Sequence, residues 1–229
     1  MIPHSGHPST AAAAAFTRTD LACLLGGFAL LASAAVPLVG GPSPRVALVL
    51  CANNLQQAGQ AFEAFAMDHD DAYPWRVSAR LGGSNGSGVA AVHWNTLSNY
   101  LPSARILACP GGRRPPAASF AALRNENIGY LIGSDSDPTG PATLVSGDLD
   151  IRGGNTAACS YVGSSPVQSF DGTFLAPTTY VAYWSDTNHL QRGNLLTADG
   201  SVQMTDAFGL KRVLSRSTDL GNNSHSLIP

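Results

Sequence analysis

The feature that most constrains this chain is an uncharged, largely apolar run close to its beginning. Residues 21–44 contain no charged side chain. A helix rises 1.5 Å per residue, so about 20 apolar residues cross the hydrocarbon core of a bilayer. Residues 21–39 have this length, which predicts a membrane-anchoring helix. A cleaved export signal, with Ala32-Ser33-Ala34 as its small-residue cleavage site, is the alternative.

Composition excludes two broad classes of protein. Charged residues make up 12% of the chain and apolar residues 44%, unlike the low hydrophobicity and high net charge of disordered chains. The formal net charge is −2 and no Lys precedes Lys211, so the chain has little to offer a phosphate backbone. We therefore expect no nucleic-acid binding.

The residues in front of the apolar run resemble a known processing segment. The stretch Ala15-Phe16-Thr17-Arg18-Thr19-Asp20-Leu21 is similar to the cleavage segment of type IV prepilins and pseudopilins. If Phe16 is the first mature residue, Pro37 falls where that family often carries a proline. The resemblance implies that a prepilin peptidase cuts between Ala15 and Phe16 and methylates the new amine.

Asp20 stands where the family carries a carboxylate. The resemblance implies that Asp20 pairs with the N-terminal amine of a neighbouring subunit and gives register to a growing fibre. A carboxylate in the first turn of a helix also caps the N-terminus, where its charge suits the helix dipole. Both roles stay open.

An amphipathic helix is expected over residues 45–67, followed by the exposed part of the protein. Its apolar residues recur at spacings of three and four, and they are Leu48, Cys51, Leu55, Ala58, Phe62 and Phe65. Such a one-sided stripe packs on a sheet of the same chain. The segment from Cys51 to Gly59, with Asn53-Asn54-Leu55, resembles pseudopilin-like proteins that carry a C-terminal His-x9-Asp-Gly motif.

The clearest strand signal lies near the end of the chain. Residues 194–205 hold two apolar-rich stretches around Asp199-Gly200, a dipeptide typical of a two-residue hairpin turn. His189 precedes Asp199 by ten residues, so His189, Asp199 and Gly200 complete the family motif. Because the motif lies on a hairpin, we expect a structural His189, bonded to backbone or to a carboxylate such as Asp186 or Asp199.

The sequence also predicts short strands over residues 105–108 and 128–132, and a long surface loop over residues 133–155. In that loop apolar periodicity is weak, and Gly, Asp, Ser and Pro are frequent. The expected fold class is α+β. The resemblance implies a pilin-like arrangement, with an N-terminal hydrophobic and amphipathic helix packed on a small antiparallel sheet.

The chain has four cysteines, which could form a disulfide or bind a metal. Cys23 lies in the apolar run, and the pairing of Cys51, Cys109 and Cys159 is not readable from the sequence. Our interpretation is a disulfide between Cys109 and Cys159, which both fall in the expected sheet region. No Cys-x-x-Cys pair occurs, which argues against a zinc site.

Three carboxylates follow the amphipathic helix, at Asp68, Asp70 and Asp71. An EF-hand loop needs an oxygen ligand at its fifth position, where this chain has Ala72, so an EF-hand is excluded. A looser calcium site and a solvated acidic turn are the two remaining interpretations. No other cofactor or metal is expected.

No zinc-protease motif and no phosphate-binding loop occurs, and we expect no enzyme activity. The resemblance implies a membrane-anchored pseudopilin-like structural subunit of a type II secretion or type IV pilus-like assembly, with like subunits or other pseudopilins as partners. It implies a leader over residues 1–15, a membrane-anchoring helix over 16–41 and an exposed α+β domain over 42–229.

The same resemblance implies a single-pass protein of the bacterial inner (cytoplasmic) membrane, with the C-terminal domain on the periplasmic side. The alternative function is an exported or surface-anchored binding protein that does not assemble and loses a signal peptide. The absence of Lys and Arg from residues 1–15 favours this alternative.

Overall fold

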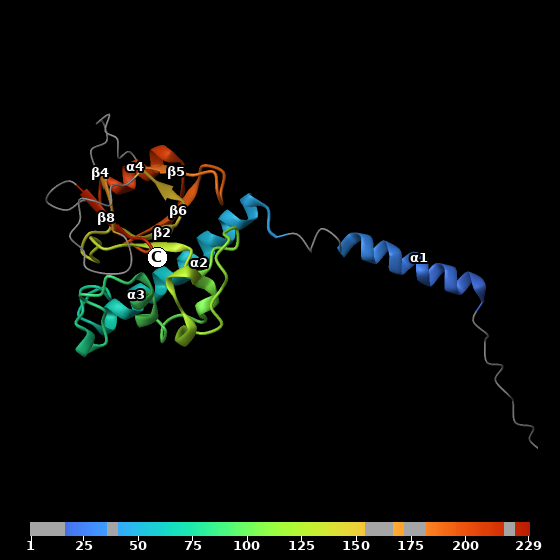
Figure 1. Cartoon of the computed structure of the whole chain (residues 1–229), viewed down its shortest axis with the longest axis horizontal. Coiled ribbons are helices and arrows are strands. Elements are labelled where there is room, and N and C mark those ends of the chain that lie inside the picture. Colours follow the sequence, from blue (N-terminus) through green and yellow to red (C-terminus); the bar gives the residue numbers. More distant parts are fainter. Residues whose placement is uncertain (1–16, 36–40, 154–166, 172–181, 218–222) are drawn as a thin grey trace, which may run out of the picture. The chain divides into compact units, whose positions relative to one another are not determined.

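The computed structural model describes residues 17–35, 41–153, 167–171, 182–217 and 223–229 (Figure 1). The chain divides into two compact units, residues 1–41 and residues 42–229. We call the second unit the head domain. Each unit is described by itself.

The first unit contains helix α1 (Arg18–Ala35). Two reciprocal hydrogen bonds close its N-terminus: Asp20 N donates to Thr17 Oγ1 (3.2 Å), and Thr17 N donates to Asp20 Oδ2 (3.0 Å). This pair is a capping box, which satisfies two amides that the start of a helix leaves without intrahelical partners. Asp20 therefore takes the capping role that its place in the first turn suggests.

Helix α1 does not supply the expected membrane anchor. In the part of the chain that the structure describes, no helix combines the length and the apolar character that a membrane crossing needs. Helix α1 has 18 residues, which span about 27 Å against a hydrocarbon core of about 30 Å, and its first turn holds Arg18 and Asp20. The predictions of a transmembrane helix within residues 16–41 and of a single-pass inner-membrane protein are therefore wrong.

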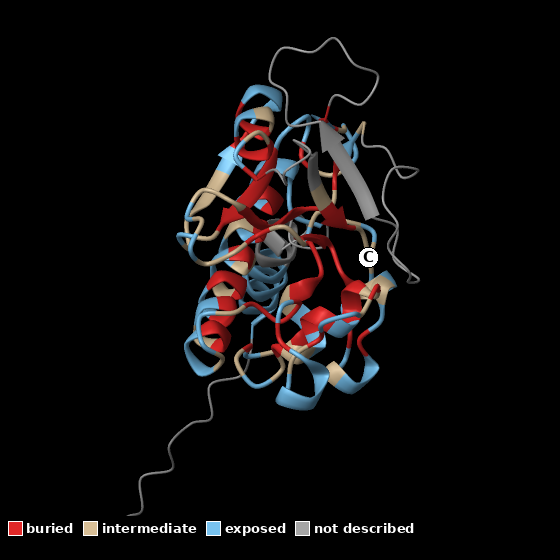
Figure 2. Cartoon of the chain, turned by 90° about the vertical axis from the view of Figure 1, so that its left-hand side faces the viewer, coloured by how far each residue is buried: buried red, intermediate tan, exposed pale blue. Residues whose placement is uncertain are grey.

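The head domain begins with the long helix α2 (Pro44–Asp68). Ser43 is its N-cap, accepting a hydrogen bond from Val46 N, and Pro44 occupies the first turn, where a missing N–H costs no hydrogen bond. The predicted apolar stripe is confirmed, because all six of its members are buried. All but Leu48 belong to the larger core, together with residues of the sheet, and buried residues gather in the interior of the head domain in Figure 2.

The sheet of the head domain has six strands in the order β4-β8-β1-β2-β6-β7, and every neighbouring pair is antiparallel. The strands are β1 (Tyr130–Gly133), β2 (Leu144–Asp148), β4 (Val167–Asp171), β6 (Gly193–Thr197), β7 (Val202–Thr205) and β8 (Asn223–Leu227). A smaller antiparallel sheet pairs β3 (Ile151–Arg152) with β5 (Tyr183–Trp184). The expected α+β class with a small antiparallel sheet is thus confirmed.

Both faces of the six-stranded sheet are covered (Figure 1). Helix α2 and the segments that follow it cover one face, where Tyr130, Ile132 and Leu196 join the larger core. Helix α4 (Ala207–Leu214) and Trp184 cover the other, with Leu131 and Leu195. Neighbouring residues of β1 and β6 thus point to opposite cores, as the pleat of a strand requires.

Short helices fill the segment between α2 and the sheet. They are η2 (Ala79–Leu81), α3 (Ala90–Thr96), η3 (Ala104–Leu107), η4 (Phe120–Ala122) and η5 (Asn125–Asn127). The strand predicted over residues 105–108 is therefore wrong: Ser103 Oγ accepts from Arg105 N and starts a 3-10 turn there. The predicted strand over residues 128–132 overlaps β1.

The predicted surface loop over residues 133–155 is also wrong, because it contains β2 and β3. Strand β2 lies between β1 and β6, and all its residues are buried. Its small and polar residues are accommodated by close packing: Ser146 Oγ donates to Leu131 O (2.7 Å), and a Cβ on Gly147 would lie 2.8 Å from Leu195 Cδ2. A strand buried on both faces does not show the polar alternation by which strands are recognised.

The predicted hairpin is confirmed in β6 and β7, but its turn has three residues rather than two. Gly200 N donates to Thr197 O, and Thr197 N donates to Ser201 O. Gly200 alone in the loop has a positive φ, at 77°. This is the type I turn with a glycine bulge rather than a type I′ turn, which needs positive φ at two successive positions.

Candidate functional site

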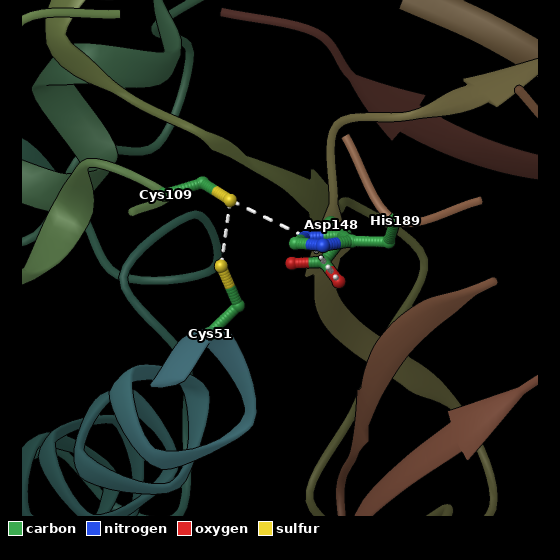
Figure 3. A group of neighbouring side chains, drawn as sticks. All are labelled: Cys51, Cys109, Asp148 and His189. Carbon is green, nitrogen blue, oxygen red and sulfur yellow. Dashed lines mark hydrogen bonds and ion pairs between the residues drawn. The ribbon is translucent and has the colours of Figure 1, made fainter. Parts of the chain in front are cut away.

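Four chemically reactive side chains meet inside the head domain (Figure 3). Cys51 comes from α2, Cys109 from the segment after η3, Asp148 from the end of β2 and His189 from the loop before β6. All four are buried, and one ligand atom from each lies within 4.8 Å of the others. We call them the thiol–imidazole cluster.

The members of the cluster form a chain of contacts. Cys51 Sγ lies 2.6 Å from Cys109 Sγ, Cys109 Sγ lies 3.3 Å from His189 Nε2, and His189 Nε2 lies 3.5 Å from Asp148 Oδ2. The two sulfurs and the imidazole point toward one another from separate segments of the chain (Figure 3). Only the folded chain brings them together.

Local packing explains why these side chains reach the same point. Cys51 belongs to the buried stripe of α2. Gly129 allows the backbone at Cys109 to approach β1, because a Cβ on Gly129 would lie 2.6 Å from Cys109 N. Leu190 and Gln191, directly after His189, both adopt positive φ (55° and 61°), which non-glycine residues rarely do and which turns the chain toward β6.

Asn194 of β6 holds the carboxylate of the cluster. Its backbone N donates to Asp148 Oδ2 (2.8 Å), and its side-chain Nδ2 donates to the same oxygen (2.9 Å) and to Leu48 O of α2 (2.9 Å). One amide side chain thus connects α2, β2 and β6. These bonds fix the orientation of Asp148 toward His189.

Burial and mutual contact shift the ionisation of all four groups. The hydrogen bond from Cys51 lowers the pKa of Cys109 to about 5, with a further contribution from His189. The same hydrogen bond, together with burial, raises the pKa of Cys51. Burial raises the pKa of Asp148 to about 7, against the opposing charge of His189. Burial opposes protonation of His189, but its contacts with Cys109 and Asp148 outweigh this and raise its pKa.

The arrangement does not match a catalytic relay. In a Cys–His–Asp relay the nucleophile and the carboxylate contact different ring nitrogens of the histidine. Here His189 Nε2 faces both Cys109 and Asp148, while His189 Nδ1 has no hydrogen-bond partner among the described residues. Asp148 Oδ1 also has none in the same part of the chain. The cluster therefore supports thiol or metal chemistry better than acyl transfer.

Two thiols, an imidazole and a carboxylate are the donors that Zn²⁺ and other thiophilic ions take. In the part of the chain that the structure describes, this cluster is where three or more such side chains converge. A zinc site was not expected from the sequence, because these ligands come from four distant segments and show no ligand spacing. The sulfurs of a tetrahedral site, each about 2.3 Å from the metal, would have to lie farther apart than 2.6 Å.

The two halves of the sequence motif serve different parts of the fold. His189 faces Asp148 rather than Asp186 or Asp199, the carboxylates considered from the sequence. Asp199 Oδ1 accepts from Thr197 Oγ1 (2.7 Å) and Ser201 N (3.0 Å), which holds the β6–β7 turn. Gln56 Nε2 of α2 donates to Gly200 O (3.2 Å), so the turn is also tied to the long helix.

The acidic residues after α2 lie apart from the thiol–imidazole cluster. Asp68 Oδ2 accepts from Tyr100 Oη (2.8 Å). Asp70 and Asp71 adopt positive φ (53° and 55°), and Asp71 lines a cavity beside Tyr73 and Asp199. In the described ranges these three aspartates do not form a group of converging ligands. A calcium site here stays a prediction from sequence alone.

The structure describes only some of the other predicted site residues. Ala15, Phe16 and Cys159 lie outside the described residues, so cleavage before Phe16 and the Cys109–Cys159 bridge stay predictions. The sulfur found beside Cys109 is that of Cys51. The sequence signal for Cys51 was its place in the buried stripe, and no signal pointed to Asp148.

Comparisons with protein-family models, with curated proteins and with solved structures found no match, so the site is interpreted from its own geometry.

Proposed function

We propose that this protein is a pseudopilin-like structural subunit that associates with other copies of itself through α1 and displays the head domain, without catalysing a reaction. The single observation that carries the proposal is an apolar, exposed face on α1. The resemblance of residues 15–21 and of the His189, Asp199 and Gly200 motif to pseudopilin-like proteins supports it further.

The exposed face of α1 consists of Leu21, Leu24, Leu25 and Phe28, which we call the α1 stripe. Their exposed fractions are 53%, 55%, 63% and 75%. Spacings of three, one and three residues place them along one side of a helix. Soluble proteins rarely leave such a contiguous apolar surface uncovered unless another surface binds there.

A second copy of the same helix is the partner that this surface fits best. Beyond Arg18 and Asp20 in its first turn, α1 has no charged side chain, so the α1 stripe offers no charge complementarity to a different partner. The i, i+3, i+4, i+7 pattern is the one by which helices pack side by side. The proposal therefore assigns α1 to the contact between subunits.

Analytical ultracentrifugation of the full chain tests the proposal. We expect a concentration-dependent, discrete oligomer for the wild type. Burying one leucine is worth about 1.5–3 kcal/mol, so replacing it with a charged residue weakens association by about ten- to a hundredfold. Leu25→Arg should therefore raise the dissociation constant, and Leu21→Arg should do the same.

Leu81→Arg is the matched control, because Leu81 is 71% exposed but belongs to η2 of the head domain. It should leave association unchanged. A wild-type chain that stays monomeric at all concentrations would contradict the proposal and favour the non-assembling binding protein. Equal weakening by Leu25→Arg and Leu81→Arg would contradict it as well, since association would then not depend on α1.

A further inference from the structure

We propose that Cys51 and Cys109 form a reversible disulfide, in which Cys109 is the sulfur that reacts first with an external disulfide and Cys51 is the sulfur that closes the bond. The proposal concerns the interior of the head domain and does not depend on assembly through α1. It assigns covalent chemistry to two of the four members of the thiol–imidazole cluster.

The distance between the sulfurs is the first observation. Cys51 Sγ and Cys109 Sγ lie 2.6 Å apart, about 0.5 Å beyond the ~2.05 Å of a sulfur–sulfur bond. Non-bonded carbon atoms already keep about 3.5 Å between them, and sulfur is larger. The two thiols are therefore closer than non-bonded sulfurs ordinarily lie, and a small side-chain adjustment completes the bond.

The environments of the two sulfurs differ in a way that assigns their order of reaction. Cys51 is completely enclosed, with an exposed fraction of 0%. Cys109 is 5% exposed and forms part of the wall of a cavity of about 340 Å³. An oxidant that enters this cavity meets Cys109 and not Cys51.

The same cavity indicates which kind of oxidant it admits. Arg113, Arg114 and Arg152 line it, with Asp150 as its one carboxylate among the described lining residues. Asp150 accepts from Asn188 N and Asn188 Nδ2 (2.9 Å each) and keeps its charge, so positive side chains still outnumber the one negative side chain in this lining. An excess of positive charge suits a small disulfide that carries carboxylates, and oxidised glutathione is the probe of that class.

The reaction balances as two successive thiol–disulfide exchanges. Cys109 loses its proton, and its thiolate attacks one sulfur of the oxidised probe, forming a mixed disulfide and releasing one thiolate. Cys51 then loses its proton and attacks the Cys109 sulfur, forming the Cys51–Cys109 bond and releasing the second thiolate. The two protons end on the two released thiols, so the probe is reduced by two electrons and the protein is oxidised by two.

Peptide mapping of the full chain carrying Cys23→Ser tests the proposal, since that variant removes the exposed thiol of α1 and keeps Cys51, Cys109 and Cys159. After incubation with oxidised glutathione, the peptides containing Cys51 and Cys109 should be found joined. Reduction should lower Tm by on the order of 10 °C, because the bond closes a loop of 58 residues.

Two further variants test the order of reaction in the same background. Cys51→Ser should accumulate glutathione on Cys109, because the closing sulfur is missing. Cys109→Ser should leave Cys51 unmodified, because Cys51 is enclosed. Should either variant fail to fold, the peptide map of the Cys23→Ser protein still decides whether the bond forms.

Three outcomes would overturn the proposal. The first is a map in which Cys109 is joined to Cys159 instead of Cys51. The second is a glutathione adduct on Cys51 in the Cys109→Ser protein. The third is a protein that keeps both thiols in excess oxidant but takes up one Zn²⁺ per chain, which would make the cluster a metal site.

Discussion

At the scale of single residues, Asn194 shows how a polar side chain can organise a buried site. Its side-chain amide donates to Asp148 Oδ2 and to Leu48 O. Asn194 is fully buried, so water cannot take the place of these partners. Asn194→Asp keeps the shape but removes both donors and places a second carboxylate beside Asp148. The two buried groups would then repel one another.

We therefore expect Asn194→Asp to lower the free energy of unfolding by about 3 kcal/mol or more at neutral pH, measured by urea denaturation. Asn53→Asp is the matched control, because Asn53 is exposed on α2 and its side-chain oxygen still accepts from Gln57 Nε2. That variant should change stability by about 0.5 kcal/mol at most. Equal losses for both variants would contradict the role given to Asn194.

His93 is a second buried residue whose environment has a measurable consequence. Its Nε2 must donate to Ser87 O (2.9 Å), since a carbonyl oxygen only accepts, and its Nδ1 then accepts from Ser84 Oγ (2.7 Å). The neutral ring is thus fully satisfied. Burial lowers the pKa of His93, against the smaller opposing effect of the Ser87 contact.

This direction sets the sign of a pH effect on stability. The unfolded chain takes up a proton on His93 as the pH falls below about 6.5, whereas the folded chain does not until lower pH. The contribution of His93 to the free energy of unfolding is therefore complete above that pH. It is lost as the pH falls from there toward the lower pKa of His93 in the folded protein. Between about pH 7.5 and about pH 5, the wild type should therefore lose more unfolding free energy than His93→Gln. Identical losses would show that His93 is protonated in the folded protein too.

At the scale of elements, the turn between β6 and β7 depends on one backbone angle. Gly200 has φ 77°, and a Cβ added to it would contact nothing within 4 Å, so any cost of substitution comes from conformation and not from space. Gly200→Ala should lower the free energy of unfolding by about 1 kcal/mol, measured by thermal or urea denaturation. Gly200→Asn should recover most of the loss, because asparagine tolerates this region. Equal effects of Ala and Asn would point to a lost contact instead.

Local signals explain which elements the sequence could predict. The six-residue stripe of α2 and the Asp-Gly turn depend on residues within a few positions of one another, and both are found close to where they were expected. Strand β2 was missed because both its faces are buried, with Val145 in one core and Leu144 in the other, so its residues show no polar alternation. The turn type was missed because periodicity does not tell a two-residue loop from a three-residue loop.

The thiol–imidazole cluster was out of reach of the sequence for a related reason. Cys51 and Cys109 are 58 residues apart, and Cys109 and His189 are 80 apart, with no fixed spacing to link them. His189 could be singled out by its motif, but its partner Asp148 lies in a segment that reads as a loop. Only the pairing of β2 with β6 brings the Asp148 carboxylate within 3.5 Å of His189 Nε2.

At the scale of the whole molecule, the division into two units separates the two proposals. The α1 stripe belongs to residues 1–41, and the thiol–imidazole cluster belongs to the head domain. The core of the head domain is built from its own residues, between α2 and one face of the sheet and between α4 and the other. Folding of the head should therefore not require α1.

A chain that begins at Gly41 puts this separation to a direct test, since it keeps Pro42, the Ser43 cap and all of α2. Its far-ultraviolet circular dichroism should be that of a folded α+β domain, and its Tm should lie within a few degrees of that of the full chain, because no core residue is lost. Ultracentrifugation should find it monomeric where the full chain associates. Retained association would assign the subunit contact to the head domain, while loss of folding would mean that residues 1–40 contribute to the stability of the head.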